Sequence, residues 1–344
     1  MTSSSNGIWL RRETSPTEER TVLVPADAAA LIAEGVRVTV EEADNRVFAI
    51  EEYAAAGATI VPGDTWPDAP AGEVILGLKE PSGHVQPLTH RHIFFGHAYK
   101  GQDGGPALLR RFVEGGGELY DLEYLTHEDG RRVVAFGFWA GYVGAALAAL
   151  HHRGQLKAPL TSMTRAELDA QLRAAKDDAK ALVIGALGRS GRGAVEALEV
   201  AGIPTTKWDI EETRNLDQAA ILAHDILVNT VFADAPGTPF LTAADLPRAD
   251  RVLATVSDVT CDVTSNANRL PVNDAVTDWA SPSRRLHDEP VLDVIAVDNL
   301  PSLLPRESST DFSAGLLPHL RTWSHNGAVW TRALEHFDRA KSSL

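Results

Sequence analysis

The sequence predicts an α/β protein with two domains, each built on a mainly parallel sheet, and with a cleft between them. The chain has 344 residues, which is more than one hydrophobic core usually supports. In both halves, short apolar runs alternate with segments of helical periodicity, and this alternation is typical of strand-helix-strand units. A glycine-rich turn follows one of the apolar runs, at residues 185–191.

The first half contains a helix with a clear start and end. Pro25 stands at the start of the alanine-rich segment 25–34, and Gly35 follows its end, which is the usual placement of proline and glycine around a helix. A strand should follow at 36–40. The other strands that we expect here are 58–61, 74–78, 93–95 and 119–122.

The second half begins with a segment that carries no charge, 138–150. A helix that is apolar all round is a buried helix. A surface connection should follow at 151–164, and a helix at 165–177. We expect strands at 181–184, 205–208, 226–229, 252–256 and 291–297, and helices at 191–200 and 327–344.

Composition excludes several classes of protein. A net charge of −15 argues against nucleic-acid binding, which needs clustered Lys and Arg. The single cysteine, Cys261, rules out an internal disulfide and a cysteine-based zinc site, and we expect no metal. No apolar run reaches 18 residues, and residues 1–6 do not resemble a signal peptide. We therefore expect a soluble, cytoplasmic protein without a membrane partner.

The glycine-rich turn Gly185-Ala-Leu-Gly188-Arg-Ser-Gly191 predicts a dinucleotide site. Between a strand and a helix, such a turn lets backbone N–H groups approach a pyrophosphate. Asp209 follows the next strand, where an acid can bind the ribose hydroxyls, and this favours NAD over NADP. A tight strand-to-helix connection is the simpler alternative. The ordered strand, turn, helix, strand and acid favour a Rossmann-like nucleotide domain.

Two polar clusters in the first half follow predicted strands. Lys79 and Glu80 come after one strand, and His97 and Lys100 come after the next. Polar residues at the carboxyl ends of parallel strands are where α/β proteins place their sites. A lysine near a carboxylate and a histidine can divide acid and base roles. Taken singly, each is more often a solvated or structural side chain.

Seven segments together resemble the NAD-dependent, lysine-forming saccharopine dehydrogenases, within the group that includes alanine dehydrogenase. They occur in the family order across nearly the whole chain, and they are far more specific than the glycine turn. The segments are 10–14 with Arg20, 75–80, 117–123, 130–137, 184–189, 207–210 and 297–306.

The resemblance implies a reaction and a place in lysine metabolism. Saccharopine would be cleaved oxidatively to lysine and 2-oxoglutarate, with NAD as the hydride acceptor, and the reaction is reversible. Lys79 would take the proton from the substrate amine, and His97 would assist the attack of water on the imine. Glu80, Glu123 and Lys100 would tune the pKa values of these two groups.

The resemblance also implies contacts and domains. The domain formed by 1–137 and 322–344 would be the catalytic, substrate-binding domain, and 138–321 the NAD-binding domain. The implied substrate contacts are Arg20, Gln102, Arg132, Phe136, Thr260, Cys261 and Asp262. The implied cofactor contacts are Arg131, Gly188, Arg189, Asp209, Thr213, Phe232, Val259, Val297, Asp298, Asn299 and Leu300.

One departure and two alternatives bear on this interpretation. Ser15 stands where the relatives have a lysine near the active site, which could change substrate preference. Another amino-acid or opine dehydrogenase of the group, acting for example on alanine, is the nearest alternative. A regulatory NAD-binding protein without catalysis is a second alternative, and the presence of both Lys79 and His97 speaks against it.

Overall fold

The chain divides into two compact units. The computed structural model describes residues 7–81, 86–323 and 327–344. Unit 1 comprises Met1–Ala135 and Pro305–Leu344, and unit 2 comprises Phe136–Leu304. Each unit holds one six-stranded sheet. These sheets confirm the predicted α/β class with two mainly parallel sheets.

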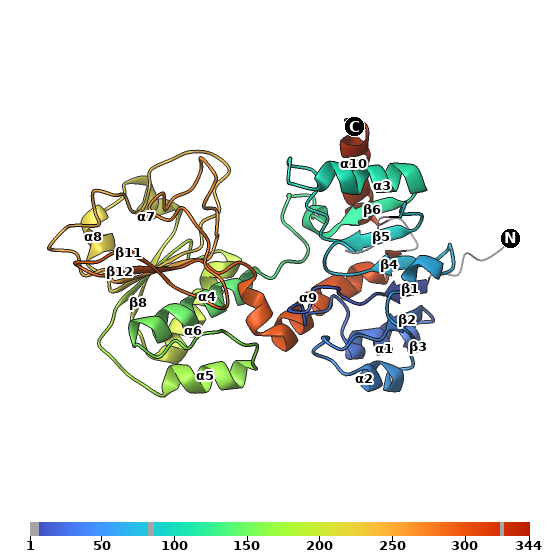
Figure 1. Ribbon diagram of the computed structural model, residues 1–344, viewed down its shortest axis with the longest axis horizontal. Helices are drawn as coiled ribbons and strands as arrows, with labels where there is room; N and C mark the ends of the chain where they lie inside the picture. The colour runs from blue at the N-terminus through green and yellow to red at the C-terminus, as the bar shows by residue number, and fades with distance from the viewer. Residues whose placement is uncertain (1–6, 82–85, 324–326) are drawn as a thin grey trace. The chain divides into compact units, whose positions relative to one another are not determined.

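Unit 1 is a parallel sheet covered by helices (Figure 1). Its strand order is β3-β2-β1-β4-β5-β6, and every neighbouring pair is parallel. The order reverses between β1 and β4, so the carboxyl ends of these two strands flank the position where such sheets bind ligands. The strands are β1 (Gly7–Leu10), β2 (Arg37–Glu41), β3 (Thr59–Val61), β4 (Val74–Leu76), β5 (Arg91–Phe94) and β6 (Glu118–Asp121). The helices are α1 (Pro25–Ala33), α2 (Ile50–Ala55), α3 (Gly105–Gly115), α9 (Pro305–Leu320) and α10 (Ala328–Lys341), with the short 3-10 turns Trp66–Asp68 and Leu122–Tyr124.

Unit 2 has the strand order β11-β12-β10-β9-β7-β8. Only the β11–β12 pair is antiparallel. Here the order reverses between β7 and β9, next to the glycine-rich turn. The strands are β7 (Ala181–Ile184), β8 (Thr205–Trp208), β9 (Ile226–Asn229), β10 (Thr255–Asp258), β11 (Arg284–His287) and β12 (Leu292–Ile295). The helices are α4 (Gly137–His152), α5 (Arg165–Arg173), α6 (Arg189–Ala201), α7 (Ile210–Arg214) and α8 (Gln218–Leu222), with the 3-10 turn Leu300–Leu303.

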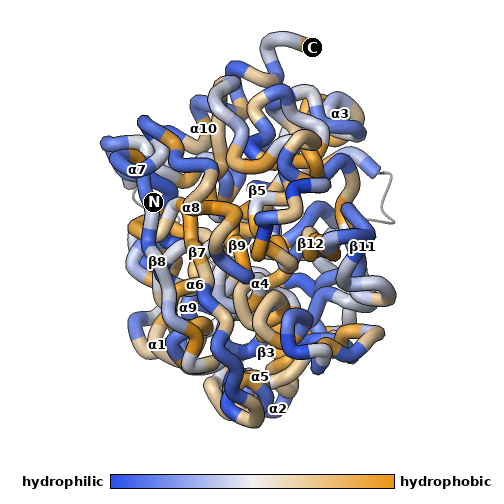
Figure 2. Tube along the Cα trace, turned by 90° about the vertical axis from the view of Figure 1, so that its left-hand side faces the viewer, coloured by the Kyte–Doolittle hydropathy of each residue, from blue (hydrophilic) through white to orange (hydrophobic). Residues whose placement is uncertain are grey.

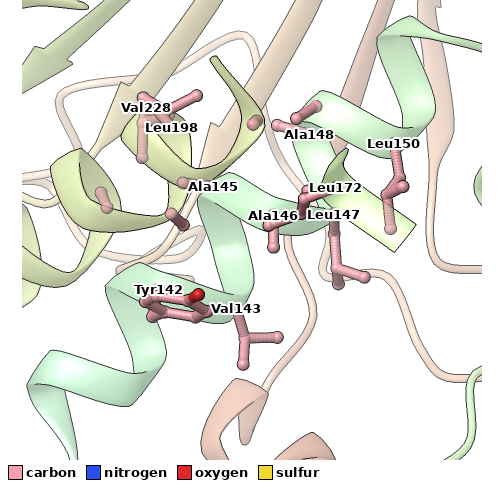
Figure 3. Close-up of a cluster of buried hydrophobic side chains, with 14 of the residues drawn as sticks. Tyr142, Val143, Ala145, Ala146, Leu147, Ala148, Leu150, Leu172, Leu198 and Val228 are labelled. Atoms are coloured by element: carbon pink, nitrogen blue, oxygen red, sulfur yellow. The ribbon is translucent and has the colours of Figure 1, made fainter. Parts of the chain in front are cut away.

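The charge-free segment is the buried helix that the sequence predicts. Helix α4 packs on α6 and on the sheet of unit 2. In Figure 3, Ala145 of α4 lies with Leu198 of α6 and Val228 of β9. The strands beneath are apolar throughout their centres, and β7 and β9 are orange in Figure 2. Strands buried on both faces read as continuous apolar runs, which is why they were recognisable in the sequence.

Glycines allow α4 and α6 to approach closely. A Cβ built on Gly141 would lie 1.7 Å from the carbonyl oxygen of Ser190, and one built on Gly193 would lie 1.9 Å from that of Phe138. Both obstacles are backbone atoms, which cannot rotate away. The start of α6, directly after the glycine-rich turn, is therefore fixed against α4.

One predicted domain boundary differs from the structure. We expected residues up to 321 in the second domain, but α9 belongs to unit 1. Its buried serines explain this: Ser309 Oγ accepts the N–H of Thr21 at 2.9 Å, and Ser313 Oγ accepts that of Val24 at 3.1 Å. These hydrogen bonds attach α9 beside α1 (Figure 1). The serines make α9 polar in sequence, which hid its burial.

Among the described residues, every helix is too short or too polar to cross a bilayer.

The α4–α6 contact gives a stability prediction. We expect Gly141→Ala to lower the free energy of unfolding by about 1–3 kcal/mol, because overpacking forces the two helices apart. Chemical denaturation measures this. Gly315→Ala is the matched control inside α9: its Cβ would lie 3.1 Å from a Val134 side-chain carbon and 4.0 Å from the Val133 carbonyl oxygen, so its effect should be much smaller. Equal stability of wild type and Gly141→Ala would contradict the close contact.

Candidate active site

Lys79 lies in the loop that follows β4, at the switch point of the unit 1 sheet. Its side chain is partly exposed. Glu80 next to it pairs with Arg111 at 3.1 Å, and burial nevertheless raises the pKa of the Glu80 carboxyl. The sequence correctly put the lysine and its acidic neighbour at the carboxyl end of a strand.

His97 follows the neighbouring strand β5 and has an unusual backbone. Its φ is +48°, in the left-handed region that costs a residue with a Cβ about 1 kcal/mol or more. The imidazole is 55% exposed and stacks on Phe95 with ring centroids 6.1 Å apart. Strained backbone held in place by its surroundings is a feature that clusters at functional sites.

Glu123 connects His97 with Lys100. Its Oε2 lies 3.8 Å from His97 Nδ1, and its Oε1 accepts a hydrogen bond from Lys100 Nζ at 2.9 Å. This hydrogen bond raises the pKa of Lys100, so Lys100 stays cationic. Gln102, through Oε1, accepts the Lys100 N–H at 2.8 Å. The structure thus brings together the histidine and two of the neighbours that the sequence assigned to it.

Asp121 holds the backbone next to His97 and at Glu123. Sequence reasoning missed this residue. The residue is fully buried, and its carboxylate accepts the N–H of Gly96 at 3.2 Å and of Glu123 at 2.9 Å. Burial raises the pKa of Asp121 to about 7. The available signal was an acid at the end of the predicted strand 119–122.

Arg20 is buried in unit 1 and already binds a carboxylate. Its Nε and Nη2 donate to the two oxygens of Glu18 at 2.7 and 2.6 Å, and the residue is 3% exposed. The planar fork that we expected to hold a substrate carboxylate is thus engaged by Glu18. In this structure Arg20 and Glu18 form an ion pair in which the positive charge is balanced.

Arg131 and Arg132 occupy an exposed hairpin of unit 1. Arg132 bridges to Thr126 through the backbone. The Arg131 guanidinium donates to Asp129 at 2.6 Å and is 82% exposed. Both side chains are exposed at the surface of unit 1.

In unit 2, the glycine-rich turn joins β7 to α6. Gly185 has φ +85°, which favours glycine. A Cβ on Gly191 would lie 2.1 Å from the Gly185 carbonyl oxygen. Gly188 caps α6, and no side chain satisfies the N–H groups of the first turn from that position. Such a helix start can bind an anion.

Asp209 lies against this turn. Its Oδ2 accepts the Leu187 N–H at 3.0 Å, and its Oδ1 accepts the Ile210 N–H at 2.9 Å. The Asp209 carbonyl accepts from the Thr213 hydroxyl at 2.8 Å. The acid after β8 and the turn after β7 are therefore neighbours, as the sequence spacing predicted.

Three large apolar side chains are exposed after successive strands of unit 2. Leu187 follows β7, Ile210 follows β8 and Phe232 follows β9, with 74%, 65% and 72% of their surface exposed. Sequence reasoning identified Phe232 and missed the other two. Exposed apolar surface beside an anion-binding turn could hold a planar base.

Side-chain hydrogen bonds converge on Asp258, the last residue of β10, where the segment with Thr260, Cys261 and Asp262 begins. The Thr260 hydroxyl donates to Asp258 at 2.7 Å, and Asp258 also accepts from Asn229 and Asn273, both at 3.1 Å. Cys261 has φ +51°. Burial raises the pKa of its thiol to about 12, so the thiol stays protonated at neutral pH.

The remaining candidates lie in unit 2. Phe136 immediately precedes α4. Asn299, after β12, has φ +57° and donates its N–H to Asp298 at 2.8 Å. With Arg131 as the one exception, the predicted cofactor contacts all fall in unit 2. They are Gly188, Arg189, Asp209, Thr213, Phe232, Val259, Val297, Asp298, Asn299 and Leu300.

Comparison with known proteins gives a consistent result. Residues 9–143 match the family model "Alanine dehydrogenase/PNT, N-terminal domain". A saccharopine dehydrogenase (NAD+, L-lysine-forming) of Candida glabrata is 41% identical, over 96% of this chain and 96% of its own. One of Emericella nidulans is 40% identical, over 99% and 98%.

Solved structures support the fold. An L-alanine dehydrogenase superposes with a TM-score of 0.72 at 17% identity, over 97% of this chain and 94% of its own. At that identity the likeness concerns the fold alone. The sequence relatives, in contrast, align at about 40% identity across both units. The resemblance indicated by the motifs is thereby confirmed, and the chain belongs to the saccharopine dehydrogenase (NAD+, L-lysine-forming) family.

Proposed function

We propose that this chain catalyses the NAD-dependent, reversible cleavage of saccharopine to L-lysine and 2-oxoglutarate. The observation that carries the proposal is the identity of about 40% with saccharopine dehydrogenases (NAD+, L-lysine-forming) over nearly the full length of both chains. The positions of Lys79 and His97 also support the proposal. They follow the adjacent strands β4 and β5 and would provide a base and a second acid–base group.

The residues of unit 2 fit a dinucleotide. Gly185, Gly188 and Gly191 place no side chain at their own positions in the turn, and the start of α6 favours a pyrophosphate. Asp209 would bind ribose hydroxyls and would repel a 2′-phosphate, which favours NAD. When bound, NAD would supply the acceptor for the hydride that leaves the substrate carbon carrying the secondary amine. The other predicted cofactor contacts keep that role as proposals.

The chemistry requires two side chains of this chain to carry protons. Lys79 takes the proton from the secondary amine as the carbon–nitrogen bond is oxidised to an imine. His97 then takes a proton from the water that attacks the imine carbon and passes it to the nitrogen, which gives a carbinolamine. The proton of the new hydroxyl follows the same route as the carbon–nitrogen bond breaks, so that lysine leaves as the amine and 2-oxoglutarate is released as the ketone. The Glu123 carboxylate lies beside His97 in this step.

Basic and polar residues suit a substrate with three carboxylates. Arg132 and Gln102 of unit 1 would bind carboxylates. We propose the same for Arg20, with Glu18 giving up one of the two hydrogen bonds that it accepts from the Arg20 guanidinium when substrate arrives. The other proposed substrate contacts are Phe136, Thr260, Cys261 and Asp262.

A substrate assay tests the proposed function. Purified protein with NAD and saccharopine should form NADH, followed by its absorbance, while alanine and other amino acids should give much lower rates. The reason is that only saccharopine offers a secondary amine between two charged arms. Turnover of alanine alone would contradict the proposal.

The role of Lys79 is tested by Lys79→Met. We expect kcat to fall by roughly 10²-fold or more, because the proton acceptor is lost, with NADH affinity unchanged. Stopped-flow or steady-state rates and an NADH titration measure this. Lys157→Met, an exposed lysine of unit 2, is the matched control and should keep the wild-type rate. A wild-type kcat in Lys79→Met would remove this residue from the mechanism.

Cofactor preference is tested by Asp209→Ala. The ratio of kcat/KM with NAD to kcat/KM with NADP should fall by about tenfold or more, since the acid that binds the ribose and repels a 2′-phosphate is gone. Glu212→Ala removes a neighbouring carboxylate that caps α7 through the Asp209 N–H at 2.8 Å, and it should leave the ratio near the wild-type value. An unchanged ratio in Asp209→Ala would show that another group selects the cofactor.

A further inference from the structure

Two side chains that follow β1 hold the loop that carries Lys79. Glu13 accepts the N–H of Leu78 at 2.7 Å through Oε1, and the N–H of Lys79 at 3.1 Å through Oε2. From the other side, the Arg11 guanidinium donates through Nη2 to the carbonyl oxygen of Lys79. The backbone of Lys79 is therefore fixed at both its donor and its acceptor.

Arg11 and Glu13 are themselves buried and paired. Arg11 Nη1 lies 3.5 Å from Glu13 Oε1, and the two side chains are 1% and 9% exposed. Arg11 also donates to the carbonyl of Arg12 at 2.9 Å. A Cβ on Gly77 would lie 2.5 Å from Arg11 Cζ, so the guanidinium lies directly against the chain that leads to Lys79.

The energetic cost of this arrangement points to a role beyond stability. Taking two charged side chains out of water carries a desolvation penalty that a pair of apolar side chains would avoid. The charged pair lies at the switch point of the sheet. There it forms hydrogen bonds with the backbone of Leu78 and Lys79. An apolar pair could pack there and could not bind those N–H and C=O groups.

We propose that Glu13, held by Arg11, is a positioning residue for Lys79. The inference rests on the proposed function, because it presupposes that Lys79 is the base. Glu13 acts through the backbone and transfers no proton itself. A displacement of about 1 Å in a reacting group can cost around 10²-fold in rate, so the hydrogen bonds of Glu13 should appear in kcat.

The first test is Glu13→Gln. An amide can accept only one of the two N–H groups with its oxygen, and it presents its own NH₂ to the other. We expect kcat to fall by about tenfold or more, with KM for NAD unchanged. Glu13→Asp keeps the carboxylate at a shorter reach and should recover part of the lost rate. It also serves where Glu13→Gln does not fold.

The deciding test is a double-mutant cycle with Lys79→Met. If Glu13 acts only by placing Lys79, then Glu13→Gln should cause little further loss of rate once Lys79 is absent. A merely structural role would lower the rate by the same factor in both backgrounds, and that result would overturn the inference. The single variant Lys79→Met reports separately on the proposed function: if it keeps the wild-type rate, both proposals fall.

Glu41→Gln is the matched control. Glu41 is also a buried carboxylate at the same edge of the sheet, and it accepts the N–H groups of Arg12, Asp64 and Trp66 at 3.0, 3.1 and 2.6 Å. No hydrogen bond between Glu41 and the Lys79 loop is found among the described residues. Glu41→Gln should therefore change the rate by the same factor in the wild-type and the Lys79→Met backgrounds. If the rate effect of Glu41→Gln also disappeared in the Lys79→Met background, the cycle would report a general loosening of the carboxyl edge of the sheet, and the inference about Glu13 would be overturned.

Discussion

The structure depends on hydrogen bonds from backbone N–H groups to carboxylates, buried in unit 1 and half-buried in unit 2, at the carboxyl edges of its two sheets. Where parallel strands end, the following loops carry N–H groups that no neighbouring strand can satisfy. Glu13 and Asp121 accept such groups in unit 1, and Asp209 does so in unit 2. Some of the acidic side chains therefore have a structural role, and these lie next to the candidate site residues.

The same constraint explains how the site residues are presented. Lys79 and His97 follow adjacent strands. Glu13 accepts the N–H of Lys79, and Asp121 accepts that of Gly96, the residue before His97. A base fixed in this way loses little freedom when substrate binds. The strained backbone of His97 fits the same scheme, because the hydrogen bond from Gly96 to Asp121 and the stacking on Phe95 hold the turn in its conformation.

The sequence predicted the parts of the fold that depend on local pattern. Apolar runs such as Ala181–Ile184 and the charge-free α4 were recognised because burial on all sides leaves a continuous apolar signal. The edge strand β11 was missed because it is polar. Helix α9 was missed because its buried face uses serine hydroxyls whose partners lie almost 300 residues earlier.

Lys79 and His97 were identified because polar residues at the carboxyl ends of parallel strands often form sites. Asp209 was identified from its position after the strand that follows the glycine-rich turn. Glu13 and Asp121 escaped notice because their partners are 65 and 25 residues away along the chain. Only the sheet brings these residues together. An acid of this kind looks like any solvated carboxylate until the strand order is known.

Amide hydrogen exchange tests the central claim most directly. In Glu13→Gln, the amides of Leu78 and Lys79 should exchange at least about tenfold faster than in the wild type, because a lost hydrogen bond makes local opening easier. The amides of the turn 185–191 should exchange at an unchanged rate. Equal exchange of Leu78 and Lys79 in the two proteins would contradict the view that buried carboxylates hold the loops of the active site.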